Sequence, residues 1–93
     1  MRTIERSSAF KRDYKRASKG RHRAVLENAL RQVLLALAAD QPLEVRLRDH
    51  ELSGNWVGYR ECHLRPDLLL IYRKPDADTL QLARLGSHAE LFG

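Results

Sequence analysis

Side chains that can move protons gather in the second half of the sequence. They comprise three of the four histidines, with an aspartate and an arginine between them: His50, His63, Asp67, Arg84 and His88. The three histidines fall at expected strand ends or turns, where functional sites tend to form. Because unperturbed imidazole has a pKa of about 6.5, histidine can give or take a proton near neutral pH. The set predicts general acid–base chemistry.

Cleavage of RNA needs such a set. A base takes the 2′-OH proton, an acid protonates the 5′-oxygen, and a cation offsets charge on the crowded phosphate. Two or three histidines, an aspartate and an arginine supply these groups without a metal ion. Phe92, near an exposed end, can stack on a nucleotide base. The alternative is that each side chain only satisfies a hydrogen bond in a loop, and for any single histidine that would be the better interpretation.

Metal ligation is a weaker interpretation of the same residues. His63 and Asp67 are four positions apart, but Pro66 prevents the helix that would place them on one face. The sequence also has no HExxH or CxxC pattern. Cys62 and His63 are neighbours on an expected strand, so they point to opposite faces and form no catalytic pair. We therefore expect no metal or other cofactor, and we expect Cys62 and Trp56 to lie in the core.

Hydrophobic periodicity predicts the elements that position these groups. Apolar residues from Val25 to Leu37 recur at helical spacing, and the run Leu68–Tyr72 is typical of a strand buried on both faces. We expect helices over about 9–19 and 22–39, and strands over about 2–6, 45–48, 56–64, 68–72 and 79–85. This order predicts an α+β fold, with two N-terminal helices packed on one face of a four- to five-stranded, mainly antiparallel sheet. The opposite face is left open for function.

The chain is short and its charge is uneven. Its 93 residues suit one domain over 1–93, and the formal net charge is +5. Residues 1–23 hold nine Lys/Arg and two acidic residues, which favours nucleic acid or an acidic protein as partner, with a solvated helix face as the alternative. His22, at the start of the second helix, is expected to be solvated surface. A lone Cys62 and a charged N-terminus favour a soluble cytoplasmic protein.

Several short motifs occur in a fixed order from residue 49 to the end of the chain. They are Asp49-His50, Leu52-x-Gly54-x-Trp56-x-Gly58-Tyr59-Arg60, His63-x-x-Pro66-Asp67, Leu70-Ile71-Tyr72, Arg84-x-Gly86-x-His88 and Leu91-Phe92-Gly93. With these motifs the chain closely resembles the YafQ family, which are toxins of the RelE/ParE superfamily in bacterial toxin–antitoxin pairs. The resemblance covers nearly the whole chain and is weakest in the basic N-terminal helices.

The resemblance implies an endoribonuclease, or mRNA interferase, that cuts mRNA in the ribosomal A site. It implies a RelE-like fold, the 70S ribosome and mRNA as targets, and a cognate antitoxin resembling DinJ as the neutralising partner, without a membrane. One position departs from the pattern, since many members have Trp after the Pro-Asp pair and this chain has Leu68. Functional positions of the family carry over onto His50, His63, Asp67, Arg84, His88 and Phe92.

In the implied reaction, the 2′-OH attacks the adjacent phosphate and leaves a 2′,3′-cyclic phosphate and a 5′-OH. Which histidine is base and which is acid stays open, and the first assignment is His50 as base and His88 as acid. Asp67 would orient a histidine, and Arg84 would offset charge on the phosphorane. Two other classes compete with this one: a non-catalytic ParE-like gyrase inhibitor, and a general basic nucleic-acid-binding module.

Overall fold

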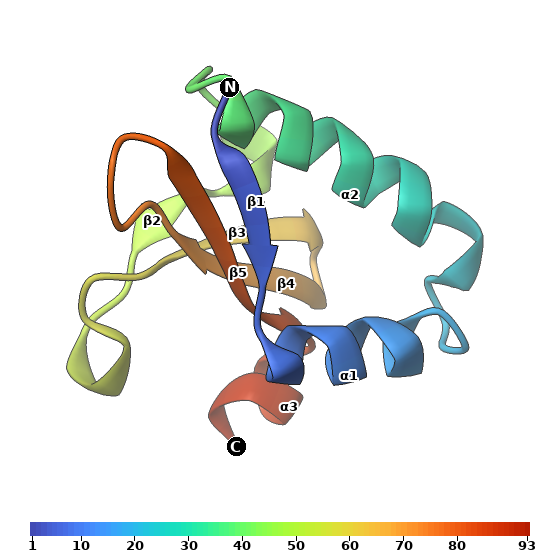
Figure 1. Cartoon of the computed structure of the whole chain (residues 1–93). Helices are drawn as coiled ribbons and strands as arrows, with labels where there is room; N and C mark the ends of the chain where they lie inside the picture. Colours follow the sequence, from blue (N-terminus) through green and yellow to red (C-terminus); the bar gives the residue numbers. More distant parts are fainter.

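The computed structural model describes residues 1–93 and contains one five-stranded sheet with three α-helices (Figure 1). The strand order is β1-β5-β4-β3-β2, with β1 parallel to β5 and every other pair antiparallel. This confirms the expected α+β fold. The elements are β1 (Thr3–Arg6), α1 (Ser8–Ala17), α2 (Arg23–Ala38), β2 (His50–Glu51), β3 (Arg60–Arg65), β4 (Leu68–Arg73), β5 (Thr79–Gly86) and α3 (His88–Phe92), with 3₁₀ helices at Val45–Leu47 and Gly54–Trp56.

The first two helices cover one face of the sheet, as predicted. α1 begins where the Ser7 hydroxyl accepts a hydrogen bond from the backbone N–H of Phe10, which satisfies a free donor of the first turn. The apolar stripe of α2 is buried against the sheet, and the main core has 15 buried residues that include Phe10, Leu26 and Leu30. None of the three helices is long and apolar enough to cross a bilayer.

The sheet face turned away from α1 and α2 is here called the open face. On β3, Cys62 belongs to the main core, so the alternation of side chains along a strand places Glu61 and His63 on the open face. On β4, Leu69 and Ile71 form a second, smaller cluster there with Leu91 of α3. Because both faces of β4 are packed, its first five residues are buried, which confirms the predicted central strand.

Two predicted strands differ from the structure. Residues 45–48 form a 3₁₀ helix over Val45–Leu47, because four residues of alternation cannot establish a strand without a partner. The strand expected from residue 56 begins only at Arg60. Before it, the chain turns through Gly54–Trp56 and then Gly58, whose φ of 91° suits glycine and ends extended pairing. The end of the chain, expected as a turn, is the short helix α3.

Candidate active site on the open face

Three titratable side chains meet where β2 pairs with β3. His50 lies opposite Glu61 in the strand register, and His63 follows two residues later on the same strand face. The Glu61 Oε2 atom is 3.1 Å from His50 Nε2 and 3.8 Å from His63 Nε2. The two imidazole rings have their centroids 6.3 Å apart. These three residues are called the histidine side of the site.

Glu61 is unusual because its carboxylate is buried and incompletely bonded. The residue is only 5% exposed, and its Oε1 atom has no hydrogen-bond partner in the protein. An unpaired buried carboxylate oxygen is costly to leave unsatisfied, so such a group in a native fold calls for a functional explanation. The buried carboxylate is therefore best placed to act on the imidazoles of His50 and His63, which its other oxygen approaches.

Backbone geometry orients His50 toward Glu61. The Nδ1 atom of His50 lies 2.7 Å from the Arg48 carbonyl oxygen, which can only accept, so Nδ1 carries a proton. Arg48 adopts a left-handed conformation with φ 53°, which is uncommon for a residue with a Cβ and is often found at functional sites. With Nδ1 occupied, Nε2 faces the carboxylate, and an attractive contact there requires one proton between His50 and Glu61.

The same three residues have the chemistry of a metal-ligand set. One ligand atom from each of His50, Glu61 and His63 lies within 4.8 Å of the others. Two imidazoles and a carboxylate suit zinc, copper and other first-row ions, and the Arg48 carbonyl supplies the outer hydrogen bond that ligating histidines usually have. This set was not predicted from the sequence, where His63 and Asp67 were the candidate ligand pair.

A second group of predicted residues lies across the open face. Arg84 is near the end of β5, and His88 and Phe92 are one helical turn apart on α3, with ring centroids at 4.9 Å. His88 and Phe92 are both exposed, while Leu91 turns inward onto the second cluster. Arg84, His88 and Phe92 are called the arginine side.

The strand register sets the distance between the two sides. One row of paired residues runs Glu61–Ile71–Arg84, and two rows further along the strands, again on the open face, His63 and Leu69 pair in line with Gly86, just before α3. Neighbouring strands are about 4.8 Å apart, so β3 and β5 are about 10 Å apart across β4. Apolar side chains of β4 line the base of the space between β3 and β5. The histidine side and the arginine side therefore lie two strands apart in the sheet.

Asp67 does not join either group in the structure. Its carboxylate contacts His22 Nε2 at 2.6 Å and Arg21 Nη1 at 3.1 Å, at the start of α2. The hydrogen bond with His22, with its charge and that of Arg21, lowers the pKa of Asp67 despite some desolvation. Asp67 orients a histidine as predicted, but that histidine is His22. The expectation that His22 is merely solvated surface is wrong, because its side chain is only 23% exposed.

Three further expectations concern residues near the site. Cys62 is fully buried, and desolvation raises its pKa to about 12, which confirms a core residue and excludes a reactive thiolate. Trp56 packs against the second cluster and meets Tyr59 edge-on at 5.1 Å, so it is partly buried rather than free to stack. Leu68, where many relatives have Trp, is 4% exposed within the main core.

The residues missed from sequence are the acidic ones. Glu61 and His63 are two positions apart on a strand, so they share a face, and that spacing was a usable signal. Asp13 on α1 is also buried, and it bonds Arg84 from 71 positions away in the sequence. No local pattern could have found this contact, because Asp13 stands among basic residues that resemble a solvated helix face.

The chain resembles known toxins over its full length. The family model of YafQ, bacterial toxins of type II toxin–antitoxin systems, matches residues 2–93. The mRNA interferase toxin YafQ of Escherichia coli K12 is 41% identical over 93 residues, which are 99% of this chain and 97% of that protein.

Solved structures show the same fold. YafQ in a crystal structure of the E. coli DinJ–YafQ complex aligns with a TM-score of 0.85 at 38% identity, over 100% of both chains. A copper-bound mutant toxin from Helicobacter pylori aligns with a TM-score of 0.86 at 36% identity, over 99% of this chain and 100% of that one. A match over nearly the whole chain, in both sequence and fold, shows that this protein belongs to the YafQ family of bacterial type II toxins, a family of endoribonucleases.

Proposed function

We propose that this protein is a ribosome-dependent endoribonuclease that cleaves mRNA in the A site, and that a cognate antitoxin resembling DinJ neutralises it. The observation that carries the proposal is the pair of groups facing one another across the open face. One group offers proton acceptors and donors, and the other offers a cation, an imidazole and an exposed ring. Membership of the YafQ family and the name of the E. coli relative support the substrate.

The histidine side takes the 2′-OH proton in this mechanism. The imidazoles of His50 and His63 are the available acceptors, with the buried Glu61 carboxylate behind them. Since the contact between Glu61 and His50 already holds one proton, the trio passes protons as a unit, and the base is the trio rather than His50 alone. The 2′-oxygen then attacks the adjacent phosphorus, and the 2′,3′-cyclic phosphate forms.

The arginine side serves the leaving group. Arg84 offsets negative charge on the phosphorane, as a fixed cation near the reacting phosphate does. His88, exposed at the first turn of α3, donates a proton to the departing 5′-oxygen. Phe92 stacks on a nucleotide base beside it. Asp67 supports this arrangement from the rim of the site, where it ties the strand turn to His22.

The basic N-terminal helices are proposed as the surface that contacts ribosomal RNA. Lys11, Arg12 and Lys15 are exposed on α1, and such side chains bind phosphate without reading sequence. The same surface suits an acidic antitoxin, which would block the ribosome, the open face, or both. Ribosomes place the proposed activity in the cytoplasm.

The test is primer extension on an mRNA programmed into ribosomes, with ribosome-free RNA as control. Wild-type protein should cut at A-site codons only with ribosomes, whereas His88→Ala should cut roughly 10²–10⁴-fold more slowly. Full activity in a variant lacking His50, His63 and His88 would overturn the mechanism. DNA damage without mRNA loss on expression would instead indicate a gyrase-directed toxin.

A further inference from the structure

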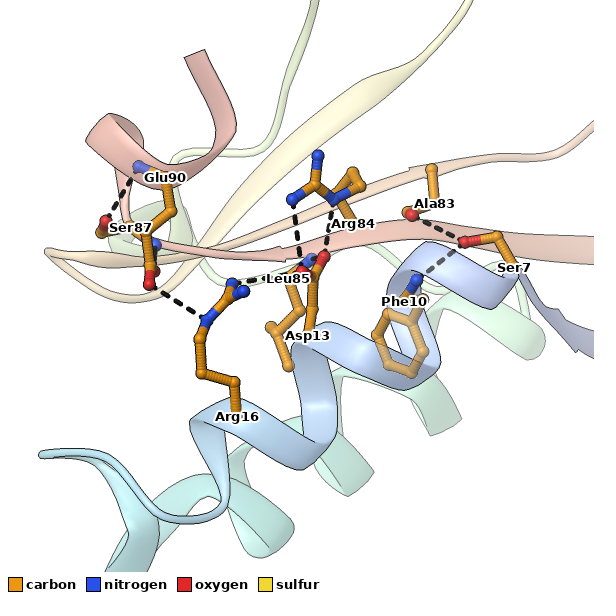
Figure 2. A network of polar contacts seen from close by, with 9 residues as sticks. All are labelled: Ser7, Phe10, Asp13, Arg16, Ala83, Arg84, Leu85, Ser87 and Glu90. Carbon is orange, nitrogen blue, oxygen red and sulfur yellow. Dashed lines mark hydrogen bonds and ion pairs between the residues drawn. The ribbon is translucent and has the colours of Figure 1, made fainter. Parts of the chain in front are cut away.

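The most highly bonded charged group in the protein is the carboxylate of Asp13 on α1 (Figure 2). The residue is only 2% exposed, and its two oxygens accept hydrogen bonds from three partners. They are Arg84 Nε at 2.6 Å and Nη2 at 3.2 Å, the backbone N–H of Leu85 at 3.0 Å, and Arg16 Nη2 at 3.1 Å. A carboxylate buried in this way costs desolvation that good geometry must offset.

The contact with Arg84 fixes the direction of the guanidinium. Two parallel N–H···O bonds to one carboxylate form a planar fork, which allows the group little rotation. Nε and Nη2 are occupied, so the Nη1 end is the part left to meet a phosphate. The bond to the Leu85 backbone holds the carboxylate itself in register with β5. Asp13 thus fixes both the orientation of the Arg84 side chain and the position of β5, the strand that carries it.

A second arm runs from Asp13 to α3 (Figure 2). Arg16 bonds Asp13 through Nη2 and pairs with Glu90 Oε2 through Nε, at 3.1 Å in both cases. Glu90 also forms a capping box with Ser87, in which Oε1 accepts from the Ser87 N–H at 2.8 Å. One carboxylate therefore both caps α3 and tethers it to α1.

α3 needs such a tether because it is very short. A helix of five residues is not stable by itself in water, since its first turn is costly to nucleate. Gly86, where β5 passes into α3, allows the close approach of the tether. A Cβ there would lie 2.9 Å from Glu90 Oε1 and 3.3 Å from Arg16 Nη2. The placement of His88 and Phe92 thus depends on a contact between two distant parts of the chain.

We propose that Asp13 is a positioning residue for RNA cleavage, which sets the orientation of Arg84 and the docking of α3. This inference rests on the proposed function, because Arg84 and His88 must act on the phosphate for their placement to matter. Asp13 itself lies beneath these groups and touches no substrate. Its role is to hold the arginine side at the right distance from the histidine side.

Asp13→Asn tests the contact of Asp13 with Arg84, which is the first arm of the network. The amide oxygen can replace Oδ2 and still accept from Leu85 and from Arg84 Nε. The NH₂ group that replaces Oδ1 cannot accept from Nη2 of Arg84 or of Arg16, so the planar fork and the bond to Arg16 are both lost. We expect kcat for cleavage on programmed ribosomes to fall roughly 10²-fold with little change in KM, because the lost interaction acts in the transition state. Asp40→Asn is the matched control, since Asp40 also sits between two cations, Arg2 and Lys74, but has no link to the site. Asp40→Asn should cleave at the wild-type rate.

A double-mutant cycle separates positioning from stability. In the Arg84→Ala background, Asp13→Asn should cost only the roughly tenfold that docking of α3 through Arg16 carries, instead of roughly 10²-fold, because the arginine it orients is gone. The melting temperature of each variant shows whether it is folded at the assay temperature. The inference would be overturned if the losses of Asp13→Asn and Arg84→Ala multiplied in full in the folded double variant. Wild-type kcat for folded Asp13→Asn would overturn it as well.

Glu90→Gln tests the second arm and keeps the inference testable if Asp13→Asn does not fold. The Glu90 side chain is 44% exposed, so the change leaves the core intact. The amide oxygen can still cap Ser87, whereas the ion pair with Arg16 is lost. We expect roughly a tenfold loss in kcat that vanishes in the His88→Ala background. An unchanged kcat would refute the tether, and an inactive wild-type protein would instead refute the proposed function.

Discussion

The two sides of the open face are built in different ways. The histidine side is local: His50, Glu61 and His63 come from two paired strands, and strand register alone brings them together. The arginine side depends on long-range contacts, because α1 holds Arg84 and α3 through Asp13 and Arg16. Strand pairing holds the histidine side rigidly, whereas the arginine side is held by a small polar network that a single mutation can disrupt. Mutations should therefore behave differently on the two sides.

The largest expected effect is a double mutation across the face. His63→Ala and His88→Ala should each cost roughly 10²–10⁴-fold in cleavage rate, and together they should cost close to the product. His50→Ala combined with His63→Ala should cost little more than one of them, because both act within one proton-sharing trio. Single-turnover cleavage on programmed ribosomes measures all these rates. If the losses in cleavage rate were equally additive for the His63/His88 pair and the His50/His63 pair, the distinction between the two sides would be wrong.

Arg84→Ala should come next, with a loss of roughly 10²–10³-fold in kcat, since it removes a charge aimed at the phosphorane. Arg84→Lys is the informative companion. An ammonium cannot form the planar fork with Asp13, so lysine should restore little of the rate although the charge is kept. Recovery to within threefold of wild type would show that charge, and not orientation, is what Arg84 supplies.

Added Cu²⁺ or Zn²⁺ should inhibit cleavage at least tenfold, because an ion on the histidine side would occupy the same nitrogen and oxygen atoms that carry protons. A chelator should restore the rate. Isothermal titration with His88→Ala should show wild-type affinity for the ion, whereas Glu61→Gln should bind it weakly. Stimulation by the ion would contradict a metal-independent reaction.

Phe92→Ala should have a smaller effect, about tenfold and mainly in KM, because the ring stacks on a base and takes no part in proton transfer. Phe92→Tyr keeps the stacking surface and should cleave at nearly the wild-type rate. Measuring both on the same programmed mRNA separates stacking from packing against His88. A loss confined to kcat would instead mean that the ring positions His88.

The smallest effect concerns acid stability. Burial raises the pKa of Asp13, but hydrogen bonds from Arg84 and Leu85 and the charges of Arg84 and Arg16 outweigh it, so the pKa is lowered. The ionised group therefore stabilises the fold fully above the ordinary aspartate pKa of about 3.9, and that contribution is lost as pH falls below it toward the lowered value. Urea unfolding at pH 7 and pH 3 should show a smaller decrease for Asp13→Asn than for wild type. An equal decrease would contradict the assignment.

The same contrast explains what could be predicted from sequence. The core stripe of α2 and the buried strand β4 follow from hydrophobic periodicity, which is a local property. The strand order, with β1 parallel to β5, was not predicted because it depends on pairing between distant segments. His50 and His63 were expected at the site, and register alone unites them. Asp67 was expected to orient a histidine, but the sequence did not indicate which one, because its partner, His22, is 45 positions away. Asp13 was missed for the same reason, since nothing near it in the sequence indicates that it is buried.

The pH dependence of single-turnover cleavage tests the central claim most directly. If one side of the open face accepts a proton and the other donates one, wild-type protein should give a bell-shaped profile. Loss of the trio in a His50→Ala/Glu61→Gln/His63→Ala variant should flatten the acidic limb, and His88→Ala should flatten the alkaline limb, because each removes the titrating groups on one side. If both variants keep the full bell, the two groups that face each other across the sheet are not the acid and the base.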